Sequence, residues 1–132
     1  MDARSATLDR LFDGFNRHAA DSVMACFSTA SVFFTAAGST AVGRRIEGKD
    51  AIREAFVAVW TEMPDVRWTV RRSRIFADGG MTEWLFTGTR PDGTRIEVEG
   101  LDLFTFDGDR VASKSAFRKD RPILPAADPV AA

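Results

Sequence analysis

The hydrophobic pattern of this chain changes period at Pro64, and this change decides the fold class. Before Pro64 apolar residues recur at helical spacing, whereas after it they alternate with polar residues with a period of two. Turn-forming sequences rich in Asp and Gly interrupt the alternation at 78–80, 91–93 and 107–109. Connections this short join antiparallel neighbours. The sequence therefore predicts a meander of four antiparallel strands, at 66–76, 81–89, 94–106 and 110–118.

Three helices are predicted before that point. Apolar residues between 8 and 15 are spaced at i, i+3, i+4 and i+7, which is one stripe of an amphipathic helix, and a shorter helix begins near Asp21. A longer stripe between 52 and 63 predicts the third helix, which Pro64 ends. The β-branched and aromatic run at 31–35 predicts a short strand between the second and third helices.

This order of elements predicts an α+β fold, with three N-terminal helices packed on a curved, mostly antiparallel sheet. A long twisted sheet curls, and helices close only part of its concave side. We therefore expect a cone-shaped pocket of small-molecule size between the two layers. The 132 residues suit one domain, which we assign to 1–121, and the Pro- and Ala-rich segment 122–132 is expected to be a loose tail.

Charge and composition argue against several classes of partner. The chain has 18 basic and 19 acidic residues and a net charge of −1, so no overall field attracts nucleic acid or an anionic membrane. The arginines of the strand 66–76 are expected to pair with Glu97 and Glu99 on a neighbouring strand. The uncharged segment 22–43 contains too many Ser, Thr and Gly residues for a membrane span. We expect no nucleic-acid partner and no membrane insertion.

The residues that usually hold metals and cofactors are scarce. One cysteine, Cys26, and one histidine, His18, rule out an internal disulfide and make an all-protein metal site improbable. No Gly-rich phosphate loop lies between a strand and a helix. The first ten residues carry Asp and Arg where a signal peptide needs an apolar run. We expect no metal, no cofactor and a cytoplasmic location.

Asp102 does not fit the pattern of its strand. It lies on the more apolar face, which it shares with Ile96, Val98, Gly100, Phe104 and Phe106. Burial disfavours the ionised form of a carboxyl, and such a group in a cavity can donate a proton, accept one, or polarise a carbonyl. Two structural alternatives stay open at this stage. Asp102 could form an ion pair with a neighbouring strand, or a bulge at Gly100 could turn it outward.

The last predicted strand offers possible partners for Asp102. Lys114 and Arg118 share one face of it, whereas Val111 falls on the other. If Lys114 or Arg118 lies on the face of Asp102, it is the natural counterion or a clamp for an anionic ligand. The alternative is a solvated strand face. Glu83 on the strand 81–89 is open to the same two interpretations.

Four segments resemble a known superfamily. They read LFDGFNRHAADSVMACFSTASVFF, GKDAIREAFVAVW, EWLFTGT and VEGLDLFTFDGDRV. Over about residues 8–121 the chain resembles the SnoaL-like and ketosteroid-isomerase-like families of the nuclear-transport-factor-2-like superfamily. The resemblance implies a cystatin-like fold. It does not single out one function, because the superfamily contains isomerases, cyclases, dehydratases, epoxide hydrolases and non-catalytic binders.

The same resemblance implies roles for individual residues. Asp102 matches the protonated aspartic acid that helps form the oxyanion hole of ketosteroid isomerases. Their general base falls on Thr35 and their oxyanion-hole tyrosine near Leu11, and the chain has no tyrosine, so that mechanism is not expected. Besides Thr35, the pocket positions implied are Phe56, Trp60, Glu83, Leu85, Val98, Asp102, Lys114 and Arg118.

Two functions are compatible with these residues. The first is a cofactor-independent enzyme of isomerase, cyclase or hydrolase type, doing acid–base chemistry on a small apolar carbonyl-like compound. Asp102 would be the catalytic group, Lys114 or Arg118 would orient it, and Phe56 and Trp60 would form an apolar wall. The alternative is a non-catalytic small-molecule-binding domain, which the missing base and tyrosine favour.

Both functions require a small apolar ligand, and both are compatible with a homodimer. Homodimers are common in the superfamily that the chain resembles. The face of the strand 94–106 opposite Asp102 carries Leu101 and Leu103, which could pack against a second copy of the chain. We therefore expect a homodimer that associates through this face of the sheet.

Overall fold

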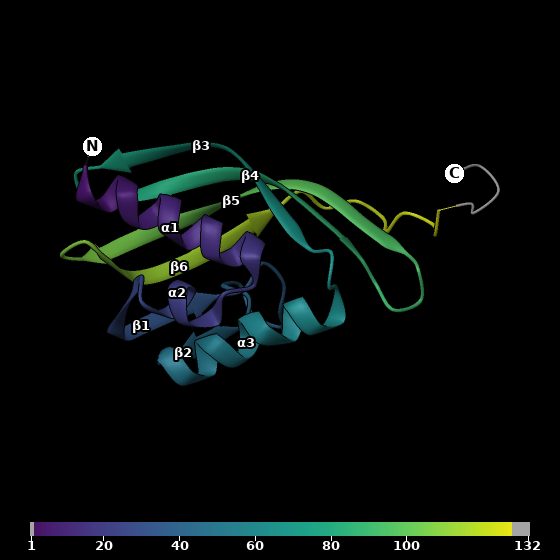
Figure 1. The fold of residues 1–132 in the computed structure, drawn as a ribbon, viewed down its shortest axis with the longest axis horizontal. Helices are drawn as coiled ribbons and strands as arrows, with labels where there is room; N and C mark the ends of the chain where they lie inside the picture. The colour runs from purple at the N-terminus through teal and green to yellow at the C-terminus, as the bar shows by residue number, and fades with distance from the viewer. Residues whose placement is uncertain (1, 128–132) are drawn as a thin grey trace.

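Three helices cover one face of a six-stranded sheet in the computed structural model, which describes residues 2–127 (Figure 1). The helices and strands follow the predicted order, with one additional short strand. The elements are α1 (Ala3–Arg17), α2 (Ala20–Met24), β1 (Phe27–Phe34), β2 (Arg45–Glu47), α3 (Lys49–Glu62), β3 (Arg67–Phe76), β4 (Gly79–Thr89), β5 (Arg95–Asp107) and β6 (Arg110–Arg118).

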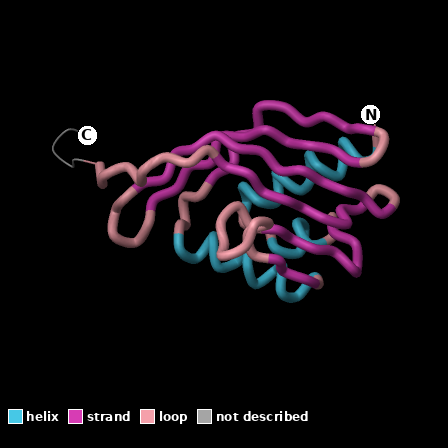
Figure 2. The backbone as a smooth tube through the Cα atoms, turned by 180° about the vertical axis from the view of Figure 1, so that it is seen from behind, coloured by secondary structure: helices cyan, strands magenta, loops and turns pink. Residues whose placement is uncertain are grey.

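The strands lie in the order β2-β1-β6-β5-β4-β3. The predicted meander is present as β3 to β6, and each pair within it is antiparallel. Strand β1 pairs with β6 in parallel, and β2 pairs with β1 antiparallel. Figure 2 shows the sheet from the side that the helices leave open. The predicted α+β fold with a mostly antiparallel sheet is confirmed, and β5 and β6 lie at its centre.

The helices attach to the sheet through the stripes predicted from the sequence. Leu8, Leu11 and Phe15 of α1 are buried, as are Ile52 and Phe56 of α3. The rings of Phe15 and Phe56 meet edge to face at a centroid distance of 4.9 Å, which joins the two helices. Burying a large apolar side chain contributes roughly 1.5–3 kcal/mol, so these two stripes hold the layers together.

A bulge places Val111 on the inner face of the sheet, opposite to the face predicted for it. The pairing of β5 with β6 shifts register between Thr105 and Phe106. As a result Val111 is fully buried in the core, whereas strict alternation placed it opposite Lys114. Beyond the bulge, Lys114 keeps the inward orientation.

The chain after β6 remains attached to the sheet for part of its length. Leu124 and Arg95 exchange two backbone hydrogen bonds, of 2.9 and 2.8 Å. The end of the predicted tail, residues 128–132, lies outside the described residues. Within residues 2–127 the structure has no helix that combines the length and the apolar character needed to cross a membrane.

Candidate functional site

Asp102 lies on the inner face of β5, near the middle of the sheet, with no exposed surface. Its neighbours across the two flanking strands are Thr82 on β4 and Ala116 on β6. Phe104 and Val98, which share its face, are buried too. The inward orientation follows from the two-residue period, and the bulge considered at Gly100 does not occur there.

Two side chains reach Asp102 from opposite sides. The ammonium of Lys114 on β6 lies 3.1 Å from Oδ1, and both side chains are almost entirely enclosed. The indole Nε1 of Trp84 on β4 donates a hydrogen bond of 3.0 Å to Oδ2. The ion-pair alternative considered for Asp102 is therefore present. The carboxyl is held in one orientation, with one oxygen toward each partner.

The ammonium of Lys114 is enclosed by aromatic rings as well as by the carboxyl. It lies 4.4 Å from the ring centroid of Phe33, 5.4 Å from that of Phe15 and 5.6 Å from that of Phe56. These rings come from β1, α1 and α3, so the ammonium lies where helices and sheet meet. Each ring offers its electron-rich face to the charge, which partly replaces the water that burial removes.

The protonation of Asp102 reflects competition between burial and these partners. Burial raises the pKa of its carboxyl, because the apolar interior disfavours the charged form. The charge of Lys114 and its close polar contact with the carboxyl, and then the hydrogen bond from Trp84, lower the pKa by less than burial raises it. The carboxyl therefore holds its proton to a higher pH than an ordinary aspartic acid does, and it can act as a proton donor.

Several buried polar atoms have no hydrogen-bond partner in the described part of the chain. They are Ser31 Oγ, Trp60 Nε1, Arg90 Nε and Asp102 Oδ1. The contact of Asp102 Oδ1 with Lys114 is an ion pair, but it is not aligned as a hydrogen bond. Buried polar groups are usually paired in native proteins. Each of these four atoms lacks the hydrogen bond that a buried polar atom usually makes.

The structure brings most of the predicted site residues to the inner side of the sheet. Phe56, Trp60 and Val98 are buried there, and Trp60 stacks on His18 at a centroid distance of 5.3 Å. Arg118 is exposed, and its guanidinium lies 5.2 Å from the ring centroid of Phe86.

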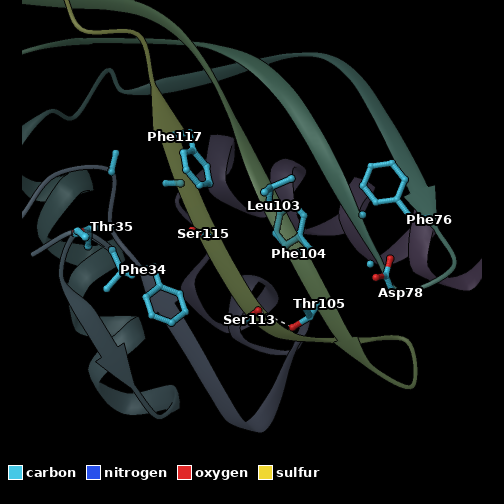
Figure 3. A pocket seen from close by; sticks show the side chains of 17 residues that line it. Phe34, Thr35, Phe76, Asp78, Leu103, Phe104, Thr105, Ser113, Ser115 and Phe117 are labelled. Atoms are coloured by element: carbon cyan, nitrogen blue, oxygen red, sulfur yellow. Dashed lines mark hydrogen bonds between the residues drawn. The ribbon is translucent and has the colours of Figure 1, made fainter.

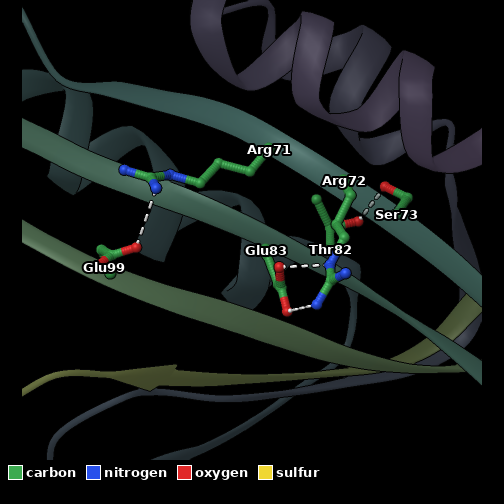
Figure 4. Close-up of polar contacts among 6 residues, drawn as sticks. All are labelled: Arg71, Arg72, Ser73, Thr82, Glu83 and Glu99. Carbon is green, nitrogen blue, oxygen red and sulfur yellow. Dashed lines mark hydrogen bonds and ion pairs between the residues drawn. The ribbon is translucent and has the colours of Figure 1, made fainter.

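The other predicted residues lie elsewhere. Glu83 and Leu85 point to the outer face of β4, away from Asp102, because the buried residues of this strand are the alternate ones. Glu83 accepts two hydrogen bonds from Arg72, of 2.7 and 3.0 Å (Figure 4). Thr35 follows β1, donates to the carbonyl of Ala37 and accepts from the backbone N–H of Arg44. These three residues are not part of the group around Asp102.

Sequence reasoning missed Trp84 as a partner of Asp102, and it missed the rings around Lys114. Alternation with Glu83 places Trp84 on the opposite face of β4, but it does not show which side chain Trp84 contacts there. Trp84 pairs with Gly100, two residues before Asp102, and this position depends on the register of β4 and β5. The contacts of the aromatic rings with Lys114 depend on where the helices lie relative to the sheet, and the sequence offers no direct signal for this arrangement.

The outer face of the sheet carries a separate hollow of about 590 Å³ (Figure 3). Its walls come from the loop after β1, the hairpin between β3 and β4, and the outward side chains of β5 and β6. Its apolar side chains include Phe34, Val42, Phe76, Leu103 and Phe117. It lies on the other side of the sheet from Asp102.

No group of three or more His, Cys, Asp and Glu side chains within residues 2–127 is arranged to hold a metal ion. Cys26 is buried, and burial raises the pKa of its thiol, which disfavours the reactive thiolate. Among the acidic side chains of residues 2–127, Asp102 is the one that is buried, and Lys114 and Trp84 contact it.

Comparison with known proteins identifies a family and a fold. The model of the SnoaL-like domain matches residues 8–114 of the chain. Among curated proteins no match is found. A solved structure from Novosphingobium aromaticivorans, described as a cystatin fold protein, has a TM-score of 0.72 and 17% identity, covering 89% of this chain and 99% of that one.

Two further solved structures share the fold. A Catenulispora acidiphila protein with a ketosteroid isomerase-like fold, in complex with trimethylamine, has a TM-score of 0.75 and 13% identity, covering 84% of this chain and 83% of that one. A putative polyketide cyclase from Sinorhizobium meliloti has a TM-score of 0.69 and 19% identity, covering 84% and 93%. At such identities these structures show a shared fold and nothing more specific.

Proposed function

The chain belongs to the SnoaL-like domain family, and from that premise we propose that it is a cofactor-independent acid–base enzyme. Its reaction would be of isomerase, cyclase or hydrolase type, on a small apolar carbonyl compound bound between the helices and the sheet. The observation that carries this proposal is the carboxyl of Asp102, fully buried and with its pKa raised by burial. A carboxyl that keeps its proton to a higher pH than usual can donate it to a carbonyl oxygen, while a water molecule accepts the proton that leaves the α-carbon.

The neighbours of Asp102 have separate roles in this proposal. Trp84 fixes the orientation of the carboxyl through its hydrogen bond to Oδ2. Lys114 compensates the negative charge that remains when the proton leaves, since its ammonium lies 3.1 Å from Oδ1. Phe56, Trp60 and Val98 provide the apolar wall. Because the pair is enclosed, the surrounding aromatic side chains must move when a substrate enters.

The proposal is tested by proton exchange at carbon. Small apolar ketones and β-keto esters are incubated with the protein in D₂O, and the loss of their α-protons is followed by NMR. The wild type should accelerate this exchange, and Asp102→Asn should reduce the acceleration by about 10²–10⁴-fold, the usual contribution of general acid–base catalysis. Glu83→Gln is the matched control, because it removes a carboxylate from the outer face of the sheet.

An equal acceleration by the wild type and Asp102→Asn would refute the catalytic role. Absence of exchange with every compound would move the assignment to the second function, a non-catalytic small-molecule binder. One observation favours that alternative: Thr35, where the isomerases have their base, lies outside the interior and is occupied by local hydrogen bonds. Stabilisation by a ligand without turnover would support it.

A homodimer and a cytoplasmic location complete the proposal. The exposed apolar side chains around the hollow on the outer face, Leu103 and Phe117 among them, support association of two copies through this face. Pairing there would leave the interior with Asp102 free to bind a ligand in each copy. The single buried thiol of Cys26 is compatible with a reducing compartment.

A further inference from the structure

Two arginines near one end of the meander have no carboxylate partner. Arg90 follows β4, and Arg118 ends β6. Within residues 2–127, neither has a carboxylate oxygen within the 4.0 Å that defines an ion pair. Exposed arginines need no such partner, because water solvates them. Arg90 is different, since its Nε is buried and makes no hydrogen bond.

The guanidinium groups of Arg90 and Arg118 lie close enough for their positive charges to repel one another. Burial lowers the pKa of Arg118, and the charge of Arg90 lowers it further. Both line one small hollow of about 180 Å³. A bound anion would relieve this repulsion and would also give Arg90 Nε an acceptor.

The charge of this hollow is positive. The basic residues in its wall are Arg90, Arg118, Lys119 and Arg121, against two acidic residues, Glu97 and Asp120. Glu97 is engaged with Arg121, which donates to its carbonyl at 3.0 Å and pairs with its side chain at 3.9 Å. The wall therefore has an excess of two positive charges, and within residues 2–127 Arg90 and Arg118 have no carboxylate partner.

A row of buried apolar side chains lies between Arg118 and Asp102 on the inner face of the sheet. The guanidinium of Arg118 lies 5.2 Å from the ring centroid of Phe86, and Val98, opposite Phe86 in the sheet, lines the hollow. The ring of Phe86 lies 6.2 Å from that of Trp84, which donates to Asp102. A molecule with an anionic end at Arg118 and an apolar body along Phe86 would point toward the proposed acid.

We propose that Arg90 and Arg118 form an anion subsite, so that the ligand of this protein is a small apolar carboxylic acid. Two planar guanidinium groups match the two oxygens of a carboxylate. The direction of the apolar body toward Asp102 rests on the function proposed above, whereas the anion subsite stands on the arginines themselves. The ligand would thus be fixed at its acidic end and react, or be recognised, at the other.

Binding of three probes tests this inference without any turnover. They are 3-phenylpropanoate, the neutral isostere 3-phenylpropanamide and inorganic phosphate, measured by calorimetry and by the NMR shift of the Arg118 Nε–H. The wild type should bind the acid about tenfold or more tightly than the amide, as expected for a charge-assisted contact. Phosphate should bind more weakly than the acid, because it has no apolar body to contact Phe86.

Substitutions locate the effect. Arg118→Gln and Arg90→Gln should each abolish the preference for the acid. Arg118→Lys keeps the charge but cannot donate two parallel hydrogen bonds to a carboxylate, so it should retain part of the preference. The matched control is Arg72→Gln, which removes an arginine from the outer face and should leave the preference unchanged. Thermal unfolding verifies that each variant is folded, and if Arg118→Gln is not, Arg90→Gln and Arg118→Lys carry the test.

Several results would overturn the inference. They are equal binding of acid and amide by the wild type, no binding of the acid, and an acid preference that survives both glutamine variants. Phosphate that binds as tightly as the acid would also overturn it, because the apolar body would then contribute nothing. The exchange experiment on Asp102 can fail while this binding test succeeds, so the two conclusions are separable.

Discussion

At the scale of the residue, the burial of Asp102 costs free energy. The ion pair with Lys114 does not by itself make this burial favourable for the stability of the fold. Removing two charges from water costs several kcal/mol per ion, and the attraction within a buried pair often does no more than offset this cost. Apolar side chains of similar volume would serve the fold as well. Lys114, Trp84 and three aromatic rings nonetheless surround this one carboxyl. The function proposed above offers a reason for this arrangement.

The raised pKa of Asp102 predicts how stability depends on pH. Because the folded protein holds this proton more tightly than the unfolded chain, protonation stabilises the fold. This contribution is complete below the unfolded pKa of about 3.9 and is lost as pH rises through the folded value. Urea denaturation should therefore show that the free energy of unfolding of the wild type, relative to that of Asp102→Asn, falls as pH rises from about 3.9 through the folded pKa of Asp102.

Glu83 provides the control for this measurement. Its hydrogen bond from Arg72 lowers its pKa, so its contribution to stability is present above its unfolded pKa and is lost as pH falls. The wild type relative to Glu83→Gln should thus show the opposite slope. A stability difference for Asp102→Asn that is constant, or that grows with pH, would contradict the raised pKa.

At the scale of the element, turn chemistry made the meander predictable. The turns at 78–80, 91–93 and 107–109 fixed four strands, and β6 was predicted with its observed bounds. The strand β2 was missed because three residues are too few for an alternating pattern. Strand β1 begins at Phe27, four residues before the predicted start, because the apolar pattern there was also compatible with the preceding helix.

The candidate site was less predictable than the fold, since it depends on register and on contacts between layers. Alternation along one strand placed Asp102 inward, but its pairing with Lys114 depends on the register of β5 and β6. The resemblance implied inward positions for Glu83 and Leu85, which lie on the outer face. In a strand, a shift of one residue moves a side chain to the opposite face. The bulge beside Val111 has the same effect.

Gly100 on β5 predicts a link between backbone packing and the geometry of Asp102. A Cβ at this position would collide with the carbonyl oxygen of Phe117 and approach the ring of Trp84 to 2.7 Å. Gly100→Ala should therefore displace Trp84 from Asp102 and destabilise the fold by about 1–3 kcal/mol, as overpacking does. Chemical denaturation and the NMR shift of the Trp84 indole N–H measure the two effects.

The control for Gly100→Ala is Gly108→Asn in the turn between β5 and β6. A Cβ there meets nothing within 4 Å, and asparagine tolerates its positive φ of 63°. Its effect on the Trp84 resonance should be negligible. If Gly100→Ala leaves both stability and that resonance unchanged, the close packing behind Trp84 is not what orients it.

At the scale of the whole molecule, the two faces of the sheet carry different chemistry. The inner face holds the acid, its partners and the aromatic core. The outer face has exposed apolar side chains around a hollow, with Leu103 and Phe117 at 42% and 52% exposure. Ion pairs such as Arg71 with Glu99, at 3.2 Å, lie elsewhere on this outer face (Figure 4). An apolar area beside charged pairs is typical of an interface between copies.

Leu103→Glu tests whether this face forms the homodimer. A charge at the centre of an apolar interface has to be buried without a partner, so the variant should be monomeric, whereas the wild type should be a dimer. Light scattering coupled to size-exclusion chromatography measures both masses. Val57→Glu, at an exposed apolar residue of α3, is the control and should leave the dimer intact. A monomeric wild type would contradict the dimer.

The most direct test of the acid–base account is the titration of Asp102 itself, followed by carboxyl-carbon NMR of the free protein. The account predicts a pKa raised above the ordinary value of about 3.9, with Lys114→Met raising it further because the counterion is lost. A pKa at or below the ordinary value would mean that Asp102 is an ionised structural carboxylate, and the catalytic role would be withdrawn.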